Sequence, residues 1–179
     1  FDALPLECSH LYLAIDRQLA AVICIADPQR EEAQDVLAAL RRLGIQKAVM
    51  LTGDSRRTAE AVASRIGIDE FCAEVLPEDK ANYVAALRAQ GHTVIMVGDG
   101  INDALALAEA DVGIAMGAMG SDAAIEAADV VLMDDDPMKI AKAIRISRKC
   151  LRIVYENIVF AIGIKLACLV LVALGFANM

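Results

Sequence analysis

The sequence contains no tryptophan, and its aromatic residues together make up only 4% of its 179 positions. Its apolar content is nevertheless 58%, so a core must be built largely from Ala, Val, Ile and Leu. That composition is typical of helices packed against a buried parallel sheet. The length is enough for one domain with a sizeable core.

Paired cysteines are also absent. The five cysteines stand alone, no Cys-X-X-Cys occurs, and neither His10 nor His92 stands at metal-ligand spacing from one of them. This pattern excludes the common zinc and dithiol motifs and favours buried or incidental thiols in a reducing compartment. The cysteines are Cys8, Cys24, Cys72, Cys150 and Cys168.

An excess of basic residues is lacking as well, since 25 acidic and 17 basic residues give a formal charge of -8. This balance argues against a nucleic-acid partner, which needs a basic protein surface. It leaves open a magnesium-phosphate site, in which clustered carboxylates hold the cation. We recognise no secretory signal. Because the chain opens with Phe1 and ends inside an apolar stretch, we expect both ends to belong to a longer polypeptide.

Strand and helix patterns alternate along most of the chain. Two strands at 11–15 and 19–26 are joined by a polar turn at 16–18, and the later elements follow at spacings of roughly ten to fifteen residues. This alternation predicts an α/β fold with a doubly wound parallel sheet, whose chemistry lies at the carboxyl ends of the strands. We expect helices at 31–43, 55–66, 79–89, 102–108 and 122–127, and further strands at 47–52, 93–97, 112–115 and 130–133.

The last part of the chain follows a different pattern. After Pro137, basic residues punctuate a long helical stretch that leads into residues 158–179, where Lys165 is the one charge. A stretch of about 20 apolar residues can span a bilayer, and basic residues before it are typical of a cytoplasmic flank. A buried core helix is the alternative, which we disfavour because the α/β pattern is complete without it.

The string Thr52-Gly53-Asp54 lies where an apolar strand ends and a helix is expected to start. A hydroxyl and backbone N–H groups at such a junction form a cradle for an anion. Thr52 is the candidate phosphate ligand, Gly53 allows close approach, and Asp54 can cap the next helix. A Thr-Gly-Asp turn that caps a helix without any ligand is the alternative.

Two further groups of polar residues complete the candidate site. Lys80 lies early in an expected helix, where the helix dipole does not favour a cation; a role over a phosphoryl group would explain it, and an exposed lysine is the alternative. Asp99, Asn102 and Asp103 crowd the end of an apolar strand, which costs stability unless a cation neutralises them. Such oxygen ligands suit Mg²⁺, with Asp99 as the best ligand and the other two supporting. A purely structural turn is the alternative there.

Several strings, in this order, resemble motifs of the haloacid-dehalogenase superfamily, and the longer ones look like the phosphorylation domain of P-type ATPases. The resemblance covers nearly the whole chain and includes the segment at 27–30, which is similar to the point where such chains re-enter that domain from the nucleotide-binding domain. The strings lie at 52–54, 73–80, 98–103, 110–117 and 127–132.

The resemblance assigns roles to five of the candidate residues. It implies that Thr52 and Lys80 contact an aspartyl phosphate formed from ATP, that Asp99 coordinates the catalytic Mg²⁺, that Asn102 contacts the phosphoryl group, and that Asp103 supports the loop. One departure is a leucine at position 105, where the family usually has proline. The change loosens the first helical turn and removes no ligand.

The subtype rests on the apolar helix. Asn157 and Ile158, followed by Lys165, resemble the zinc, cadmium and lead exporters, whereas copper exporters carry a Tyr-Asn pair that this helix lacks. The resemblance implies that Lys165 takes part in transport, pairing with an aspartate of a further helix. An ionisable group within a membrane helix is a functional candidate in general, and snorkelling to the interface is the alternative.

The phosphorylated aspartate of the family, in an Asp-Lys-Thr-Gly-Thr string, does not occur in this sequence. Asp27 follows an apolar strand, but Pro28 beside it removes one of the N–H donors that a nucleophile loop needs. We therefore expect the nucleophile to lie in a preceding part of the polypeptide, and this chain by itself to be inactive.

These inferences divide the chain into three parts: the end of a nucleotide-binding domain and its return strand at 1–26, the phosphorylation domain at 27–136, and a linker helix with a transmembrane helix at 137–179. The expected setting is a bacterial cell membrane, with the α/β domain in the cytoplasm of a multi-pass protein. The expected partners are a divalent cation (Zn²⁺, Cd²⁺ or Pb²⁺), membrane lipid, and the actuator, nucleotide-binding and transmembrane parts of the same polypeptide.

Three other functions remain open at this point. A soluble phosphatase of the same superfamily predicts a nucleophile within the chain and no membrane segment. A membrane-tethered regulatory domain with a vestigial site predicts loss of the polar cluster, all of which is present. A potassium-pumping ATPase is nearer, and only the pattern of the membrane helix argues against it.

Overall fold

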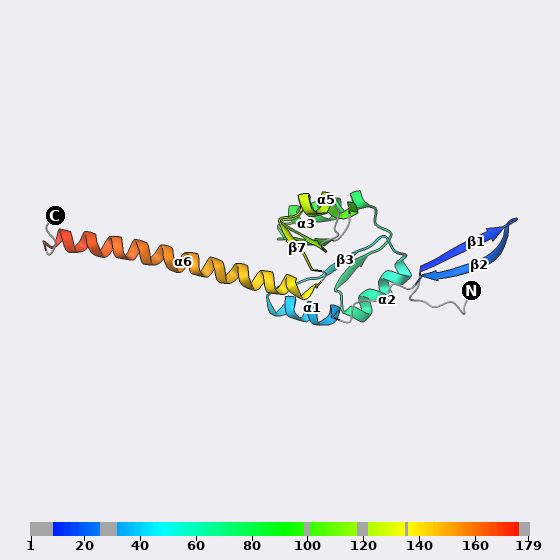
Figure 1. Cartoon of the computed structure of the whole chain (residues 1–179), viewed down its shortest axis with the longest axis horizontal. Coiled ribbons are helices and arrows are strands. Elements are labelled where there is room, and N and C mark those ends of the chain that lie inside the picture. Colours follow the sequence, from blue (N-terminus) through cyan, green and yellow to red (C-terminus); the bar gives the residue numbers. More distant parts are fainter. Residues whose placement is uncertain (1–8, 26–31, 99–100, 118–121, 135, 176–179) are drawn as a thin grey trace. The chain divides into compact units, whose positions relative to one another are not determined.

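The computed structural model describes residues 9–25, 32–98, 101–117, 122–134 and 136–175 (Figure 1). Its contacts divide the chain into two compact units, residues 1–139 and residues 140–179. The first unit contains an antiparallel hairpin and the parallel α/β part. The second consists of most of one long helix.

The hairpin is formed by β1 (Ser9–Ile15) and β2 (Gln18–Ile25), which confirms the two strands expected there. The two turn residues, Asp16 and Arg17, have φ angles of 51° and 63°. Two left-handed residues in sequence twist the chain as a tight antiparallel turn requires. Apolar side chains of both strands remain about half exposed, and a two-stranded hairpin is marginally stable alone.

The remaining strands are all parallel, which confirms the α/β class with a parallel sheet. β3 (Val49–Leu51) pairs with β4 (Glu70–Cys72), and a second sheet has the order β5 (Ile95–Gly98), β6 (Val112–Met116), β7 (Val130–Leu132). The helices between them are α1 (Ala33–Arg42), α2 (Arg56–Ile66), α3 (Pro77–Ala89), the 3-10 turn η1 (Ile101–Asp103), α4 (Ala104–Glu109) and α5 (Asp122–Ala127).

Two features of the sheet were not expected from the sequence. Strand β4 was missed, because three residues between a helix and a loop show no periodicity. The parallel strands also form two separate sheets, since no backbone pairing joins β3 to β5 within the described residues. Each of these two strands therefore has one edge without a partner strand in the described part of the chain.

The core of the α/β part lies between α3, α4, α5 and the second sheet. Val84 of α3 and Leu107 of α4 are its largest fully buried side chains, and small residues surround them. The backbone of α4 packs directly on β6, because a Cβ atom at Gly113 would lie 2.6 Å from the carbonyl oxygen of Leu107. This contact fixes the helix that follows the polar loop after β5.

Asp111 joins the starts of two neighbouring strands. Its carboxylate accepts a 2.8 Å hydrogen bond from the backbone N–H of Val94 and its own N–H donates to the Val94 carbonyl, while Arg88 of α3 pairs with the second carboxylate oxygen. Asp69 makes the same set of contacts with Ala48 and Arg41. The backbone hydrogen bond is the largest cause that lowers the pKa of each carboxyl below its usual 3.8.

These two aspartates predict acid sensitivity. A carboxyl whose pKa is lowered by folding stabilises the protein fully above the unfolded-state pKa, and that stabilisation is lost as the pH falls through the folded-state pKa. We expect Asp111→Asn to flatten the loss of stability below about pH 4, measured as urea midpoints in detergent across that range. Asp69→Asn should flatten it in the same way, and an acid slope equal to that of the parent in both variants would contradict the assignment.

The second unit is dominated by α6 (Met138–Ala173), which Figure 1 shows as one unbroken helix. Its 36 residues include a window with a mean hydropathy of 2.0, long and apolar enough to cross a membrane. None of that window is buried within the protein, so the alternative of a buried core helix finds no support in the described residues. The expected apolar stretch continued to residue 179, beyond the end of the helix at Ala173.

The cysteines that the structure describes are free, and Cys24, Cys150 and Cys168 are exposed, with Cys72 half-buried. Three of them thus lie outside the core of the described part of the chain.

Candidate phosphate-binding site

The candidate residues of the α/β part lie after the carboxyl ends of parallel strands. Thr52 directly follows β3, Lys80 lies in the first turns of α3 after β4, and Asn102 and Asp103 lie in η1 after β5. Asp99 and Gly100 lie outside the described residues, as does the rejected nucleophile Asp27.

The Thr52 loop is held by its own polar groups. The Thr52 hydroxyl donates to the Asp54 carboxylate at 2.8 Å, and the Asp54 N–H donates back to the hydroxyl oxygen at 3.1 Å. The expectation that Asp54 caps the next helix is wrong: Ser55 is the N-cap of α2, accepting from the N–H of Thr58. Asp54 instead orients the Thr52 hydroxyl, because a short carboxylate two residues away reaches that hydroxyl before it reaches the helix.

Residues 73–76, part of the string at 73–80, pack their backbone against this loop, a contact that was not expected from the sequence. The N–H of Glu74 donates to the Asp54 carbonyl at 2.9 Å, and the N–H of Val75 donates to the Thr52 carbonyl at 3.0 Å. Glu74 adopts a left-handed conformation with a φ of 57°, which is unfavourable for a residue other than glycine. The segment then leads directly into α3, so it connects the Thr52 loop to the helix that carries Lys80.

The strained backbone at Glu74 makes a prediction about stability. The free energy of unfolding of the Glu74→Gly variant should be about 2 kcal/mol higher than that of the Glu74→Val variant. The reason is that glycine adopts the left-handed region freely, whereas a β-branched residue is strained there. Urea unfolding in detergent measures the difference. The matched pair is Glu78→Gly and Glu78→Val in the first turn of α3, where helix propensity should reverse the order. A Glu74→Val variant as stable as Glu74→Gly would show that Glu74 is not strained.

Lys80 and Asp103 form the central ion pair of the site, with 2.7 Å between Lys80 Nζ and Asp103 Oδ1. Their side chains are only 15% and 12% exposed, so the pair is largely desolvated and geometrically restricted. Helix α3 presents Lys80 because Pro77 occupies its first position and the Asp79 carboxylate accepts from the Leu76 N–H. The structure thus brings together a cation and a carboxylate that the sequence places 23 residues apart.

Gly98 allows Asp103 to approach the end of β5. A Cβ atom at this position would lie 2.6 Å from Asp103 Cβ and 2.9 Å from Asp103 Oδ2, closer than side chains can pack. One carboxylate oxygen of Asp103 therefore contacts Lys80 and the other lies against the backbone of β5. Asn102, in contrast, is exposed, and its side chain makes no hydrogen bond within the described residues.

The donor set can be compared with the needs of Mg²⁺. Thr52, Asn102 and Asp103, together with Asp99, each offer a side-chain oxygen, which is the kind of ligand that Mg²⁺ prefers. Within the described residues no three His, Cys, Asp or Glu side chains form a metal cluster, and Asp103 is already engaged by Lys80. Asp103 therefore fits the supporting role expected of it.

A family model for haloacid dehalogenase-like hydrolases matches residues 3–111 of this chain, and the chain belongs to that family. Its close homologues are cadmium- and zinc-transporting ATPases. It is 52% identical over 172 residues to a cadmium, zinc and cobalt-transporting ATPase of Bacillus subtilis, covering 94% of this chain and 24% of that protein. It is also 51% identical over 153 residues to the copper-transporting ATPase 2 of Rhizobium meliloti, covering 86% of this chain and 18% of that protein.

Among solved structures, the chain is similar to a zinc-transporting PIB-type ATPase in its E2.Pi state, with a TM-score of 0.82 and 36% identity. The match covers 97% of this chain and 28% of that one. The chain thus spans about a quarter of the length of these relatives, including both the parallel α/β part and the long apolar helix.

Proposed function

We propose that this chain is the part of an ATP-driven exporter of divalent heavy-metal cations, of the Zn²⁺, Cd²⁺ or Pb²⁺ type, that holds the phosphoryl group of an aspartyl-phosphate site. The nucleophilic aspartate lies outside this sequence, on a strand that completes the parallel sheet. The proposed boundaries are those inferred from the sequence, with the phosphorylation domain at 27–136 and the membrane part at 137–179.

The observation that carries this proposal is the pair of open strand edges at β3 and β5. Both strands end in loops with candidate phosphate ligands, Thr52 after β3 and Asp103 after β5. Neither strand has more than one partner in the described residues. One additional parallel strand would pair with both edges and place its own carboxyl end between the two loops, which is where a nucleophile is needed.

Burial supports the same proposal. Parallel strands are normally covered on both faces, yet every described residue of β3 and β5 is half-buried or exposed. β6, which has neighbours on both sides, contains three buried residues. The low burial of β3 and β5 is what a missing central strand would produce.

In the proposed reaction the protein acts mainly through charge and position. The ammonium of Lys80 binds the transferred phosphoryl group, with Asp103 holding it in place as a positioning residue. The backbone N–H of Gly53 donates to a phosphate oxygen, and the Thr52 hydroxyl does the same when it exchanges its hydrogen bond to the Asp54 carboxylate for one to the phosphate. The exposed side chain of Asn102 is free to contact the same group.

Mg²⁺ would be held by Asp99, with Asp103 in support, and when bound it neutralises the charge that develops on the phosphoryl oxygens. ATP is the proposed phosphoryl donor. The transfer itself would take place beside Lys80 and the Thr52 loop, whose backbone is held by hydrogen bonds from the 73–76 segment.

The nature of the metal cargo rests on α6. Two relatives with different cargoes, cadmium, zinc and cobalt in one and copper in the other, are about equally identical to this chain, so overall identity does not decide it. Asn157 and Lys165 on α6 favour the zinc, cadmium and lead type. We propose that Lys165 lies on the transport path of a bacterial cell membrane protein whose α/β part faces the cytoplasm.

A chimera tests the proposal directly. This chain would replace the matching stretch of the Bacillus subtilis relative, and labelled ATP would be used to detect an acid-stable phosphoprotein in membranes. We expect phosphorylation and metal-stimulated ATP hydrolysis, both lost in Asp99→Ala. A folded chimera that is not phosphorylated under conditions where the parent is would contradict the proposal and favour a regulatory domain with a vestigial site.

A further inference from the structure

The first half of α6 has a basic face. At 100° per residue, five cations between residues 142 and 152 fall within about 120° of the helix circumference. All five side chains are exposed. They are Lys142, Arg145, Arg148, Lys149 and Arg152.

This face is poorly neutralised by the protein itself. In the described part of the chain the one ion pair on it joins Arg152 to Glu156 at 2.9 Å, and both side chains are well exposed, at 81% and 61%. No acid pairs with Lys149 or Arg148 among the described residues, although the chain as a whole has a formal charge of -8. A concentrated positive surface on an acidic protein calls for an anionic partner.

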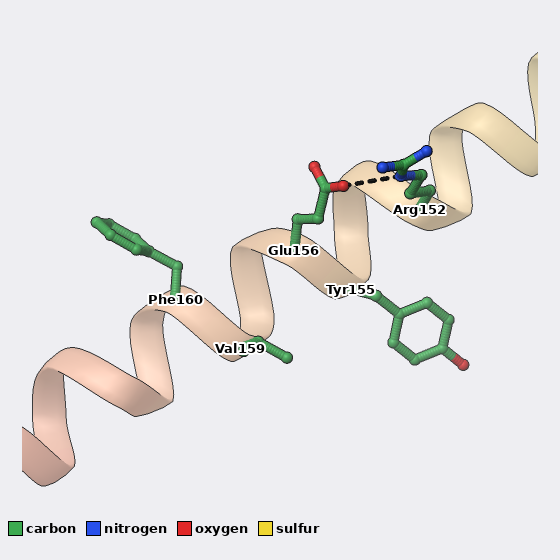
Figure 2. Close-up of a pocket in the computed structure, with 5 residues that line it drawn as sticks. All are labelled: Arg152, Tyr155, Glu156, Val159 and Phe160. Atoms are coloured by element: carbon green, nitrogen blue, oxygen red, sulfur yellow. Dashed lines mark hydrogen bonds and ion pairs between the residues drawn. The ribbon is translucent and has the colours of Figure 1, made fainter.

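The basic face continues into the apolar part of the same helix. Arg152, Tyr155, Glu156, Val159 and Phe160 line a shallow hollow along this stretch, and Figure 2 shows the Arg152–Glu156 pair on one side of the helix and Tyr155 on the other. Tyr155 is 67% exposed. Its neighbour Glu156 is followed by eight residues, 157–164, that carry no charge. A tyrosine at the start of an apolar run is typical of the membrane–water interface.

Tyr155 therefore sets the depth of the basic residues. Counting back along the helix, Arg152 lies about 5 Å and Lys149 and Arg148 lie about 10 Å on the water side of Tyr155. The polar headgroup layer of each leaflet is about 5–8 Å thick, and the surface potential decays over about 8 Å. Lys142 lies about 20 Å away, beyond that range.

We propose that Arg148, Lys149 and Arg152 form a binding surface for the headgroups of anionic phospholipids in the leaflet that α6 enters. The proposal rests on the membrane span that belongs to the proposed function. Each cation near a membrane surface attracts anionic lipid, and Arg152 keeps donors free beyond the one that Glu156 accepts. The surface thereby gathers anionic lipid around the helix and fixes its position along the bilayer normal.

The sequence offers a sharp probe, because it contains no tryptophan and Tyr155→Trp would introduce one next to the basic face. The full chain carrying this change would be reconstituted in phosphatidylcholine vesicles with a minor fraction of phosphatidylglycerol. Two vesicle preparations would be compared, in which a headgroup quencher is attached either to phosphatidylglycerol or to phosphatidylcholine. Both preparations would contain the same amount of labelled lipid. We expect the labelled phosphatidylglycerol to quench about fivefold more efficiently, and the difference to vanish near 1 M salt.

Matched variants locate the surface. R148Q/K149Q/R152Q should lose the preference, whereas K142Q/R145Q, which removes charges farther from the interface, should keep it. Equal quenching by both lipids in the parent would overturn the proposal and would indicate that acids of this protein occupy the basic face. Loss of the preference in K142Q/R145Q to the same extent would overturn the assignment to the three residues nearest the membrane.

Insertion is measured separately, by quenching of the same tryptophan with acyl-chain-labelled lipid. If the chain inserts but shows no lipid preference, the proposed lipid-binding surface is contradicted and the proposed function is not. If the full chain does not insert, both the proposed lipid-binding surface and the proposed membrane span are contradicted.

Discussion

Lys80→Met is expected to reduce phosphorylation of the chimera by about 10²-fold or more, the usual effect of removing one group that stabilises developing charge. Lys80 is the cation that α3 and Asp103 hold in a largely desolvated position, 15% exposed. Methionine keeps much of the length and apolar body of the side chain while removing its charge. It also leaves Asp103 without its partner, which should lower the free energy of unfolding by about 3 kcal/mol.

Lys47 provides the matched control for this prediction. It too pairs with a carboxylate, that of Glu70, but both side chains are well exposed, at 52% and 42%. Lys47→Met should therefore change stability by less than about 1 kcal/mol and leave phosphorylation close to the parent value. A Lys80→Met chimera that is phosphorylated at the parent rate would remove Lys80 from the site, whatever its stability.

Gly98→Ala is the second change with a large expected effect. The added methyl group would lie 2.6 Å from Asp103 Cβ, so either β5 or η1 must move. We expect a loss of about 2 kcal/mol in the free energy of unfolding and a loss of phosphorylation that exceeds what this destabilisation explains. The reason is that the movement displaces the carboxylate that positions Lys80.

Gly53→Ala separates steric cost from the general effect of adding a methyl group to a loop. A Cβ atom at Gly53 would find its nearest neighbour, the Val75 carbonyl oxygen, at an ordinary 3.8 Å. Gly53→Ala should therefore unfold at nearly the same urea concentration as the parent. If Gly98→Ala were equally stable, the close approach of Asp103 to β5 would not hold in solution.

Much of the architecture followed from the sequence because its signals are local. Apolar runs alternating with helical periodicity gave the parallel α/β class, and the Asp16–Arg17 turn marked the hairpin. Polar residues placed directly after apolar runs gave the positions of Thr52 and Asp103, since parallel strands end at one edge of a sheet. The apolar helix was recognisable from its length and its lack of charge.

The parts that were missed depend on contacts distant in sequence or on too few residues. Strand β4 is three residues long and is recognisable only by its pairing with β3. The cap at Ser55 was assigned to Asp54 because both residue types cap helices, and only the hydrogen bond from Thr52 distinguishes them. The left-handed conformation of Glu74 has no signal in the sequence, because glutamate is not a residue that marks such positions.

The most direct test of the central claim is Mg²⁺-dependent binding of fluoroberyllate, which mimics a phosphoryl group on an aspartate. The protein would be this chain preceded by a strand that carries Asp-Lys-Thr-Gly-Thr, with Asp99→Ala as the paired variant. We expect tight binding that requires Mg²⁺ and disappears in Asp99→Ala. A folded fusion that binds no fluoroberyllate, or one that binds equally well in Asp99→Ala, would contradict a magnesium-dependent aspartyl-phosphate site at the ends of β3 and β5.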